Sequence, residues 1–389
     1  MVDSIFNRIQ VIDTDTHITE PHDVWTSRVA SRWGDLVPHI QSIDGRDFWM
    51  IGDETCGGPG FYTMAGFDGT FPECPNGYAD IPPSSYDAKA RLALMDEEGI
   101  HAQVLYPNFG GFGSGGFLRL KEPELMLECV RAYNDFLVDW CSEDPNRLIP
   151  VMATPFWDID ATVKEIERCA AKGHRAVLGA GQPQVFGQPV IAHRHWDPMW
   201  AAAQEAGLSI SFHIGGGDLS ELMNDQAGMG TKANFSRVGA LCFMANQSCI
   251  AELIFGGVCH RFPKLDFASV ESGVGWLQST IEAFDWQWTN GQVTKEHPEY
   301  DLLPSEYFRR QIYGCFWFEN VGIQTALEQF PDNLMWETDY PHPTCQYPGP
   351  ANPLAQRPRE YAEMALGNVP DETLAKVLHD TPARLYGIQ

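Results

Sequence analysis

The sequence predicts a (β/α)8 barrel, an α/β fold of the TIM type in which eight parallel strands alternate with helices. Three observations favour this class: strand-like and helix-like segments alternate along the 389 residues, the strand-like runs number eight, and several end in polar side chains. In such a barrel all strand carboxyl ends open onto one face, where active sites are built. A doubly wound sheet is the alternative, but no GxGxxG motif follows the first strand.

The elements follow one another in a regular order. Strands are expected at Arg8–His17, Ala102–Tyr106, Arg147–Met152, Arg175–Leu178, Leu208–Ile214, Leu265–Glu271, Gln311–Phe316 and Leu334–Asp339. Helical patterns lie between them, at Asp87–Glu98, Pro123–Ser142, Ile159–Ala171, Pro198–Ala206, Gly239–Phe255, Val274–Trp288 and Val321–Gln329. Asp197 before Pro198 predicts a capped helix start.

Three long segments interrupt this alternation, at residues 39–85, 215–234 and 289–309. The first two follow strand carboxyl ends, so we expect them to cover the barrel mouth. We therefore expect one barrel domain over residues 1–389, with 39–85 as a lid-like insertion. Its aromatic side chains are the expected apolar contacts of the substrate: Phe61, Tyr62, Phe67 and Phe71.

Composition narrows the class of protein. Hydrophobic residues make up 44% and charged residues 20%, which supports a large core and excludes global disorder. A net charge of -26 disfavours a nucleic-acid or anionic-membrane partner. No secretory signal and no apolar run of about 18 residues is visible. We expect a cytoplasmic protein with ten reduced cysteines, a small-molecule substrate and a homo-oligomeric state, a dimer.

Side chains that bind metals recur at the expected strand ends. The first strand ends in Asp15-x-His17, the fifth in His213 and the eighth in Asp339. Because these strand ends meet at one face, the four side chains should converge on one divalent-metal site. Taken singly, each is more often a core histidine or a capping aspartate, so the prediction depends on their recurrence.

Further polar residues extend this set. Glu271 ends the sixth strand beside a glycine turn, and Glu20 follows His17 closely enough to fold back over the same place. His342 lies in the proline-stiffened DYPHPT segment and is a candidate ligand or acid/base. The expected metal ligands are thus Asp15, His17, Glu20, His213, Glu271 and Asp339, and the expected catalytic residues are Glu271 and His342.

Motifs for covalent catalysis are missing from the sequence. It contains no GxSxG elbow and no cysteine in a recognisable nucleophile motif. The run GGFGSGG at residues 110–116 lacks the Lys-Ser/Thr of a phosphate-binding loop, so we interpret it as a flexible segment at the mouth.

Several segments together resemble the amidohydrolase-2 family, which includes aminocarboxymuconate semialdehyde decarboxylase and the resorcylate decarboxylases. They are VIDTDTHITEP, ARLALMDEEGIHAQVLYP, WDPMWAAAQEAGLSISFHIGGG, SVESGVGW, LMWETDYPHPT and TPARLYGI. The resemblance implies a metal-binding barrel, with Asp15 and His17 at the positions of the usual HxH, His213 as the fifth-strand ligand and Asp339 as the eighth-strand aspartate.

Two departures from the family affect the expected function. Asp15 replaces the first histidine of HxH, and Glu271 stands where the family usually carries a catalytic histidine. The resulting carboxylate-rich set suits iron or manganese better than zinc and favours two ions. It is similar to the amidohydrolase-barrel di-iron monooxygenases of diterpenoid tailoring.

The leading expectation is therefore a dinuclear non-haem iron monooxygenase, an oxidoreductase acting on a largely apolar substrate. The alternatives are a divalent-metal-dependent hydrolase with zinc or manganese, a non-oxidative decarboxylase, and a binding barrel without catalysis. The last is disfavoured because convergent carboxylates repel one another when no cation is bound.

Overall fold

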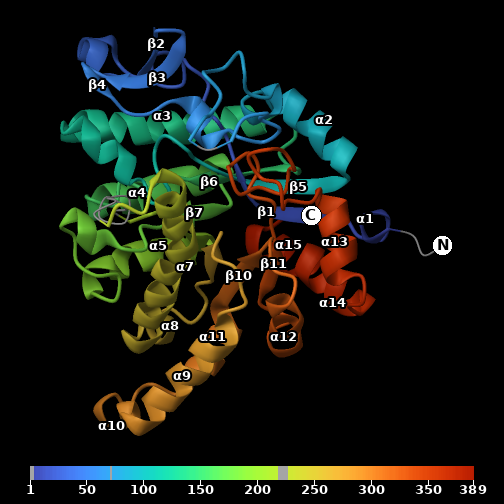
Figure 1. The fold of residues 1–389 in the computed structure, drawn as a ribbon. Helices are drawn as coiled ribbons and strands as arrows, with labels where there is room; N and C mark the ends of the chain where they lie inside the picture. The colour runs from blue at the N-terminus through green and yellow to red at the C-terminus, as the bar shows by residue number, and fades with distance from the viewer. Residues whose placement is uncertain (1–3, 71, 218–226) are drawn as a thin grey trace.

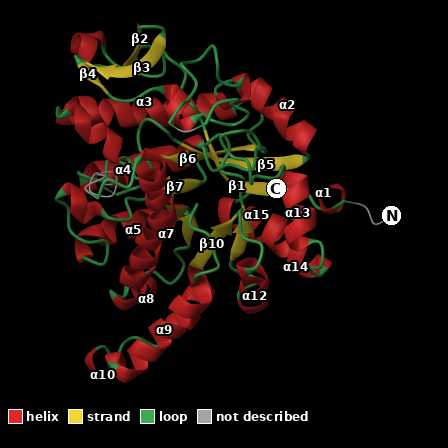
Figure 2. Ribbon diagram, in the orientation of Figure 1, coloured by secondary structure: helices red, strands yellow, loops and turns green. Residues whose placement is uncertain are grey.

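The centre of the molecule is a parallel sheet of eight strands that closes on itself. The computed structural model describes residues 4–70, 72–217 and 227–389, and Figure 2 shows the strands inside a shell of helices. The strands neighbour one another in the order β1 (Val11–His17), β5 (Ile100–Tyr106), β6 (Leu148–Met152), β7 (Ala176–Leu178), β8 (Ser209–His213), β9 (Phe267–Val270), β10 (Ile312–Phe316) and β11 (Leu334–Trp336). The predicted (β/α)8 barrel is confirmed.

The seam between the last strand and the first is closed just beyond β11. Asp339 N donates to Asp15 O at 3.0 Å, and His17 N donates to Tyr340 O at 2.6 Å. These bonds place Asp339 beside the two polar residues that end β1.

Helices cover the outside of the barrel, and each crossover between neighbouring strands contains at least one (Figure 1). In chain order these are α2 (Ala88–Glu98), α3 (Pro123–Cys141), α4 (Ile159–Lys172), α5 (Asp197–Ala206), α7 (Thr231–Phe255), α8 (Val258–Arg261), α9 (Leu277–Asn290), α10 (Val293–Glu296), α11 (Pro304–Gln311) and α12 (Gly322–Gln329). Helix α1 (Ile5–Arg8) precedes the barrel, and α13 (Pro358–Leu366), α14 (Asp371–Ala375) and α15 (Thr381–Tyr386) follow it.

The barrel interior changes from apolar to polar along the strands. Its core contains Ile12, Val104, Ile149 and Val270, all at most 1% exposed. Towards the strand carboxyl ends the buried residues become Asp, Glu and His. Because polar groups are costly to bury without partners, this change locates the end of the barrel where function is expected.

Three predictions for individual elements need correction. Helix α5 includes Asp197, which does not cap it: its carboxylate pairs with Arg261 at 2.8 Å. Helix α7 begins at Thr231, eight positions before the predicted start. Residues 289–309 contain α10 and part of α11 in place of an irregular segment.

Helix α7 also has a composition that needs comment. Of the helices in the described ranges, it is the one long and apolar enough to span a membrane, with 39% of its most apolar window buried. Core helices of soluble proteins pass the same test. Here Asn246 on α7 donates to Phe212 O at 2.9 Å and to Ser269 Oγ at 3.0 Å, which fixes the helix against β8 and β9.

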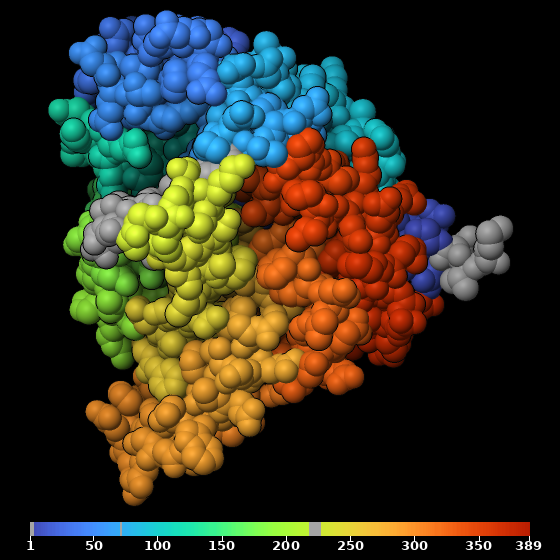
Figure 3. All heavy atoms as spheres, viewed as in Figure 1, coloured from blue at the N-terminus to red at the C-terminus, as the bar shows by residue number. Residues whose placement is uncertain are grey.

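The insertion after β1 has two parts. Its first part is an antiparallel sheet of β2 (His39–Ile43), β3 (Arg46–Ile51) and β4 (Glu54–Thr55), which lies above α3 at the edge of the molecule in Figure 1. Its second part reaches the segment after β11, where Met64 N donates to Pro341 O at 2.8 Å. Figure 3 shows the insertion, the start of α7 and the segment after β11 meeting on one face.

Candidate metal centre

Two imidazoles face each other at the carboxyl ends of β1 and β8. The Nε2 atoms of His17 and His213 lie 3.0 Å apart, and both rings are buried. His17 Nδ1 lies 3.1 Å from Pro107 O, and His213 Nδ1 lies 2.8 Å from Ile214 O. A carbonyl accepts and never donates, so each Nδ1 carries a proton and Nε2 is the nitrogen of each ring that is left to coordinate a metal ion.

The carboxylate of Asp15 faces the same space. Its Oδ1 lies 3.4 Å from His17 Nε2 and its Oδ2 lies 3.4 Å from His213 Nε2. Neither oxygen has a hydrogen-bond partner, although the side chain is fully buried. Burial and the nearby charge of Asp13 raise the pKa of Asp15. A buried carboxylate without donors is unfavourable, which is the condition that a metal ion removes.

Asp339 and Glu271 complete the acidic side of the site. Asp339 Oδ1 lies 3.8 Å from His17 Nε2, and Glu271 Oε2 lies 3.6 Å from His213 Nε2. Thr344 joins the two carboxylates: its hydroxyl lies 2.5 Å from Asp339 Oδ2 and 3.3 Å from Glu271 Oε1. Burial raises the pKa of both carboxyls, each further raised by neighbouring carboxylates.

The backbone is strained where these two carboxylates leave their strands. Glu271 has φ of 52° and Asp339 has φ of 58°, in the left-handed region that non-glycine residues rarely adopt. Such conformations persist where the surroundings hold them and are concentrated at functional sites. Here the turn redirects both side chains into the cluster.

His342 lies against this cluster. Its ring stacks on His17 with centroids 3.7 Å apart, and its Nδ1 lies 2.7 Å from Asp339 Oδ1. On the other side, its Nε2 lies 2.8 Å from Asn108 Oδ1. Burial lowers the pKa of His342 to about 3, so the ring is neutral at physiological pH.

Together these side chains form three overlapping groups of potential metal ligands, in each of which the donor atoms lie within 4.8 Å of one another. The groups are Asp15 with His17 and His213, His17 with Asp339 and His342, and Asp15 with Glu271 and Asp339. Within the described ranges, the charged contacts of these carboxylates are all with histidines. The residues present therefore fit a divalent cation, in both donor type and charge.

Glu20 does not join the cluster. Its Oε1 accepts hydrogen bonds from Asn108 N at 2.9 Å and Phe109 N at 3.0 Å, at the start of the loop after β5. These backbone donors occupy Oε1, and Glu20 belongs to none of the groups of potential ligands among the described residues, which corrects its prediction as a ligand. Burial raises its pKa to about 7.

The expected substrate aromatics have different positions. The ring of Tyr62 lies 6.0 Å from that of His342, and Phe61 lies 6.3 Å from Phe235 at the start of α7. Phe67 is partly buried further along the insertion. Phe71 lies outside the described residues.

Four residues at the site were not found from the sequence: Glu337, Asn108, Thr344 and Phe112. Glu337 is fully buried, and its Oε2 accepts from Glu271 N at 3.3 Å. Strand alternation places Glu337 on the same face as Asp339, so that signal was available. Phe112 stacks on His213 at 4.6 Å, and no sequence pattern distinguishes it from other loop aromatics.

Comparison with known proteins places this architecture among amidohydrolases. The family model described as Amidohydrolase matches residues 12–388. A 2-amino-3-carboxymuconate-6-semialdehyde decarboxylase of Dictyostelium discoideum is 21% identical over 363 residues, 89% of this chain and 88% of that protein. A gamma-resorcylate decarboxylase of Rhodococcus jostii is 30% identical over 136 residues, 32% of this chain and 38% of that protein.

Solved structures share the fold. An amidohydrolase, map2389c, from Mycobacterium avium subsp. paratuberculosis K-10 has a TM-score of 0.76 and 24% identity, with 97% of this chain and 99% of that chain covered. A dihydroxybenzoic acid decarboxylase from Polaromonas sp. JS666, with bound manganese and 2-nitroresorcinol, has a TM-score of 0.60 and 16% identity, with 97% of each chain covered.

These findings overturn the favoured enzyme class. The curated relatives that match are decarboxylases, so the expected di-iron monooxygenase is wrong. Iron is not indicated either, because the decarboxylase structures described with a metal carry manganese. The error arose because a carboxylate-rich ligand set was interpreted as evidence for oxygen chemistry, although such a set reports the charge of the cation and not its reaction.

Proposed function

This chain belongs to the amidohydrolase family, and on that premise we propose that it is a divalent-metal-dependent, non-oxidative decarboxylase of small aromatic carboxylates. The observation that carries the proposal is the pair of Nε2 lone pairs 3.0 Å apart beside the unpartnered carboxylate of Asp15. The matching relatives, decarboxylases of muconate-semialdehyde and resorcylate type, support the reaction class.

Asp15, His17, His213 and Asp339 are the proposed metal ligands. When bound, a divalent cation supplies a Lewis acid that orients and polarises the substrate's carboxylate and an adjacent oxygen. Manganese, found in two related structures, is the metal to test first, and zinc the second. The carboxylates of Asp15 and Asp339 would offset the charge of the cation.

Glu271 is the proposed proton donor. Loss of CO2 breaks a carbon–carbon bond and leaves its electron pair on the ring carbon, which must take up a proton. Burial and the charge of Asp339 raise the pKa of Glu271, which favours the protonated form that a proton donor needs. A carboxylic acid thereby takes the part that an imidazole plays elsewhere in the family, and water reprotonates it after product leaves.

His342 is the proposed positioning residue for the ligands His17 and Asp339. Its ring is held between Asn108 and Asp339 and stacked on His17, so it fixes the orientation of both ligands. The insertion 39–85 is proposed as part of the same barrel domain, with Phe61, Tyr62 and Phe67 as its apolar contribution to the substrate site.

The reaction can be tested on manganese-loaded protein without oxygen. Ortho-hydroxybenzoates are supplied as a panel, CO2 release is measured, and the product formed in D2O is examined by mass spectrometry. We expect CO2 and deuterium at the vacated carbon. Glu271→Gln should lower kcat by about 10³-fold or more while metal content stays unchanged.

The second candidate is a metal-dependent hydrolase. It is favoured by the position of Glu271, whose carboxylate, when ionised, lies where a general base could activate water. The same protein incubated with esters, amides and lactones distinguishes the two. Hydrolysis without CO2 from any aromatic carboxylate contradicts the decarboxylase and establishes the hydrolase.

A further inference from the structure

One aromatic ring touches all three imidazoles of the metal centre. The Phe112 ring stacks on His213 at a centroid distance of 4.6 Å and an interplanar angle of 28°. It meets His17 edge-on at 5.1 Å and His342 at 5.4 Å. The three histidines are buried, whereas Phe112 itself is only partly buried. Phe112 therefore separates the metal centre from the outside.

Two glycine-rich segments make room for this ring. A Cβ at Gly215 would lie 3.0 Å from Phe112 Cδ2, and a Cβ at Gly216 would lie 2.9 Å from Phe112 O. A Cβ at Gly113 would lie 3.1 Å from Gly216 O. Residues 110–116 and 215–217 thus pack closely because side chains are missing on both sides. Gly215 and Gly216 therefore leave the space in which Phe112 stacks on His213.

A second aromatic side chain closes the arrangement from the insertion. Tyr62 meets Phe112 edge-on at 6.0 Å and an angle of 89°, and burial raises the pKa of its hydroxyl, which keeps it protonated. Phe112 thus contacts the three imidazoles and Tyr62, and Tyr62 in turn lies 6.0 Å from His342. A substrate that lies beside the metal ligands on this side contacts the Phe112 ring.

The geometry points to Phe112 as the residue that selects a planar aromatic ring as substrate. This inference rests on the proposed decarboxylase function and deepens it, because it names the feature of the substrate that the site recognises. A flat ring can lie face-to-face on Phe112 beside the metal ligands. A saturated ring of similar size is thicker and lacks the quadrupole that aromatic stacking uses.

The test compares two ligands on three variants of the manganese-loaded protein. The ligands are 2-hydroxybenzoate and its saturated analogue, 2-hydroxycyclohexane carboxylate, and dissociation constants are measured by calorimetry. The unmodified protein should bind the planar ligand about 10-fold more tightly, the gain expected from aromatic stacking. Phe112→Leu, which keeps the bulk but removes the ring, should reduce the preference to less than about 3-fold.

A matched control comes from the same loop. Phe109 packs on Trp25 at 4.8 Å and on Trp49 at 4.9 Å, outside the metal centre. Phe109→Leu should keep the full preference for the planar ligand. If Phe112→Leu keeps it too, or if Phe109→Leu loses as much, the inference is overturned, because the ring of Phe112 is then not what discriminates.

A third measurement separates this inference from the proposed function. Water proton relaxation by bound manganese reports solvent access and needs no substrate. Phe112→Ala should increase that relaxation with unchanged metal content, and unchanged relaxation would show that Phe112 does not cover the centre. Enhanced relaxation with no CO2 release from any carboxylate would refute the decarboxylase while the covering role of Phe112 stands.

Discussion

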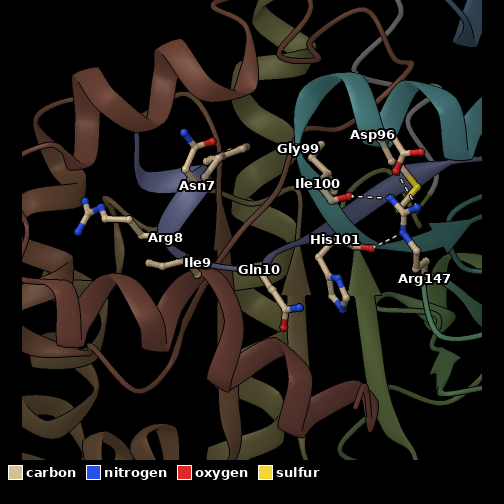
Figure 4. A pocket seen from close by; sticks show the side chains of 11 residues that line it. Asn7, Arg8, Ile9, Gln10, Asp96, Gly99, Ile100, His101 and Arg147 are labelled. Atoms are coloured by element: carbon tan, nitrogen blue, oxygen red, sulfur yellow. Dashed lines mark hydrogen bonds and ion pairs between the residues drawn. The ribbon is translucent and has the colours of Figure 1, made fainter. Parts of the chain in front are cut away.

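The two ends of strands β1 and β5 differ in how their polar side chains are satisfied. At the carboxyl ends, both oxygens of Asp15 are buried without a hydrogen-bond partner beside the imidazoles of His17 and His213. At the amino ends, a groove of about 510 Å³ is lined by residues 6–10 and 99–101 together with Met95, Asp96 and Arg147 (Figure 4).

The guanidinium of Arg147, at one side of that groove, is fully engaged by the protein. Arg147 Nη1 lies 2.8 Å from Asp96 Oδ1, its Nε donates to His101 O at 2.9 Å and its Nη2 donates to Ile100 O at 3.1 Å. Figure 4 shows these contacts gathered on one side of the groove. Its guanidinium fastens the start of β5 to the start of β6.

In this barrel the open groove and the candidate functional site therefore lie at opposite ends of the strands. The amino-end groove has volume, but the guanidinium of Arg147 has protein partners there. At the carboxyl end, buried carboxylate oxygens of Asp15, Glu337 and Asp339 gather without hydrogen-bond partners. This concentration of unpartnered carboxylates in one cluster marks the candidate site.

The largest expected effect comes from removing an imidazole at the carboxyl end. His213→Ala should lower manganese content from about one ion per chain to below about 0.1 after dialysis, because it removes a ligand. Arg147→Met, at the other end of the barrel, should bind the metal normally. Elemental analysis of both proteins checks this, and equal metal contents would abolish the distinction between the two ends.

A substitution at the amino end of the barrel should change the stability of the fold. Arg147→Met leaves two backbone carbonyls and Asp96 without their donor, and we expect the free energy of unfolding to fall by about 2 kcal/mol. Urea unfolding followed by circular dichroism gives the change, with His213→Ala measured in the presence of a chelator as the control. A stability loss for His213→Ala larger than that for Arg147→Met would contradict this assignment.

A smaller effect is expected from the hydroxyl that joins the two acidic ligands. Thr344→Val keeps the shape of the side chain but removes the donor to Asp339 and Glu271, so manganese affinity should fall by about 10-fold. Thr344→Ser, which retains the hydroxyl, should stay close to the unmodified protein. Competition with a fluorescent chelator measures both, and identical affinities for Val and Ser would show that the bond does not tune the metal.

The smallest effect concerns pH at the start of β7. Burial lowers the pKa of His174 to about 4, so the folded state keeps this ring neutral while the unfolded chain binds a proton below about pH 6.5. The unfolded state binds more protons in this window, and stability therefore falls as pH decreases. Between pH 8 and pH 6 the free energy of unfolding should fall by about 1 kcal/mol less in His174→Gln than in the unmodified protein. Urea titrations at the two pH values measure this difference. If both proteins lose the same free energy of unfolding between pH 8 and pH 6, His174 is not a source of acid sensitivity.

Much of the barrel was predictable because the ends of its strands can be recognised from the residues found there. Each of the eight barrel strands overlaps a predicted one, and β5 starts two residues early, whereas β2, β3 and β4 of the insertion were not predicted. His17 and His213 end strands in which side-chain direction alternates, so the face of each follows from the period of a strand. Asp339 was predicted to end the last strand but lies three residues beyond β11. Their convergence then follows from the parallel order of the barrel.

The positions of residues outside regular strands could not be predicted in this way. Glu20 lies three residues beyond β1, where no periodicity constrains its direction, and it turned to the backbone of Asn108 and Phe109. Phe112 is placed by the close approach of two glycine segments distant in sequence, which only the folded chain brings together. The reaction class was misjudged because ligand types indicate a charge to be bound, whereas the reaction depends on the proton donor and the covering groups.

The anchors of the two central imidazoles have a consequence for how this barrel can change during evolution. Pro107 O and Ile214 O are main-chain atoms, so no substitution of a side chain deletes them. The tautomers of His17 and His213 are thus inherited with the backbone, while Thr344, Asn108 and Phe112 can be exchanged one at a time. Point mutations can therefore change the substrate or the proton donor, while the main chain continues to hold the orientation of the two imidazoles.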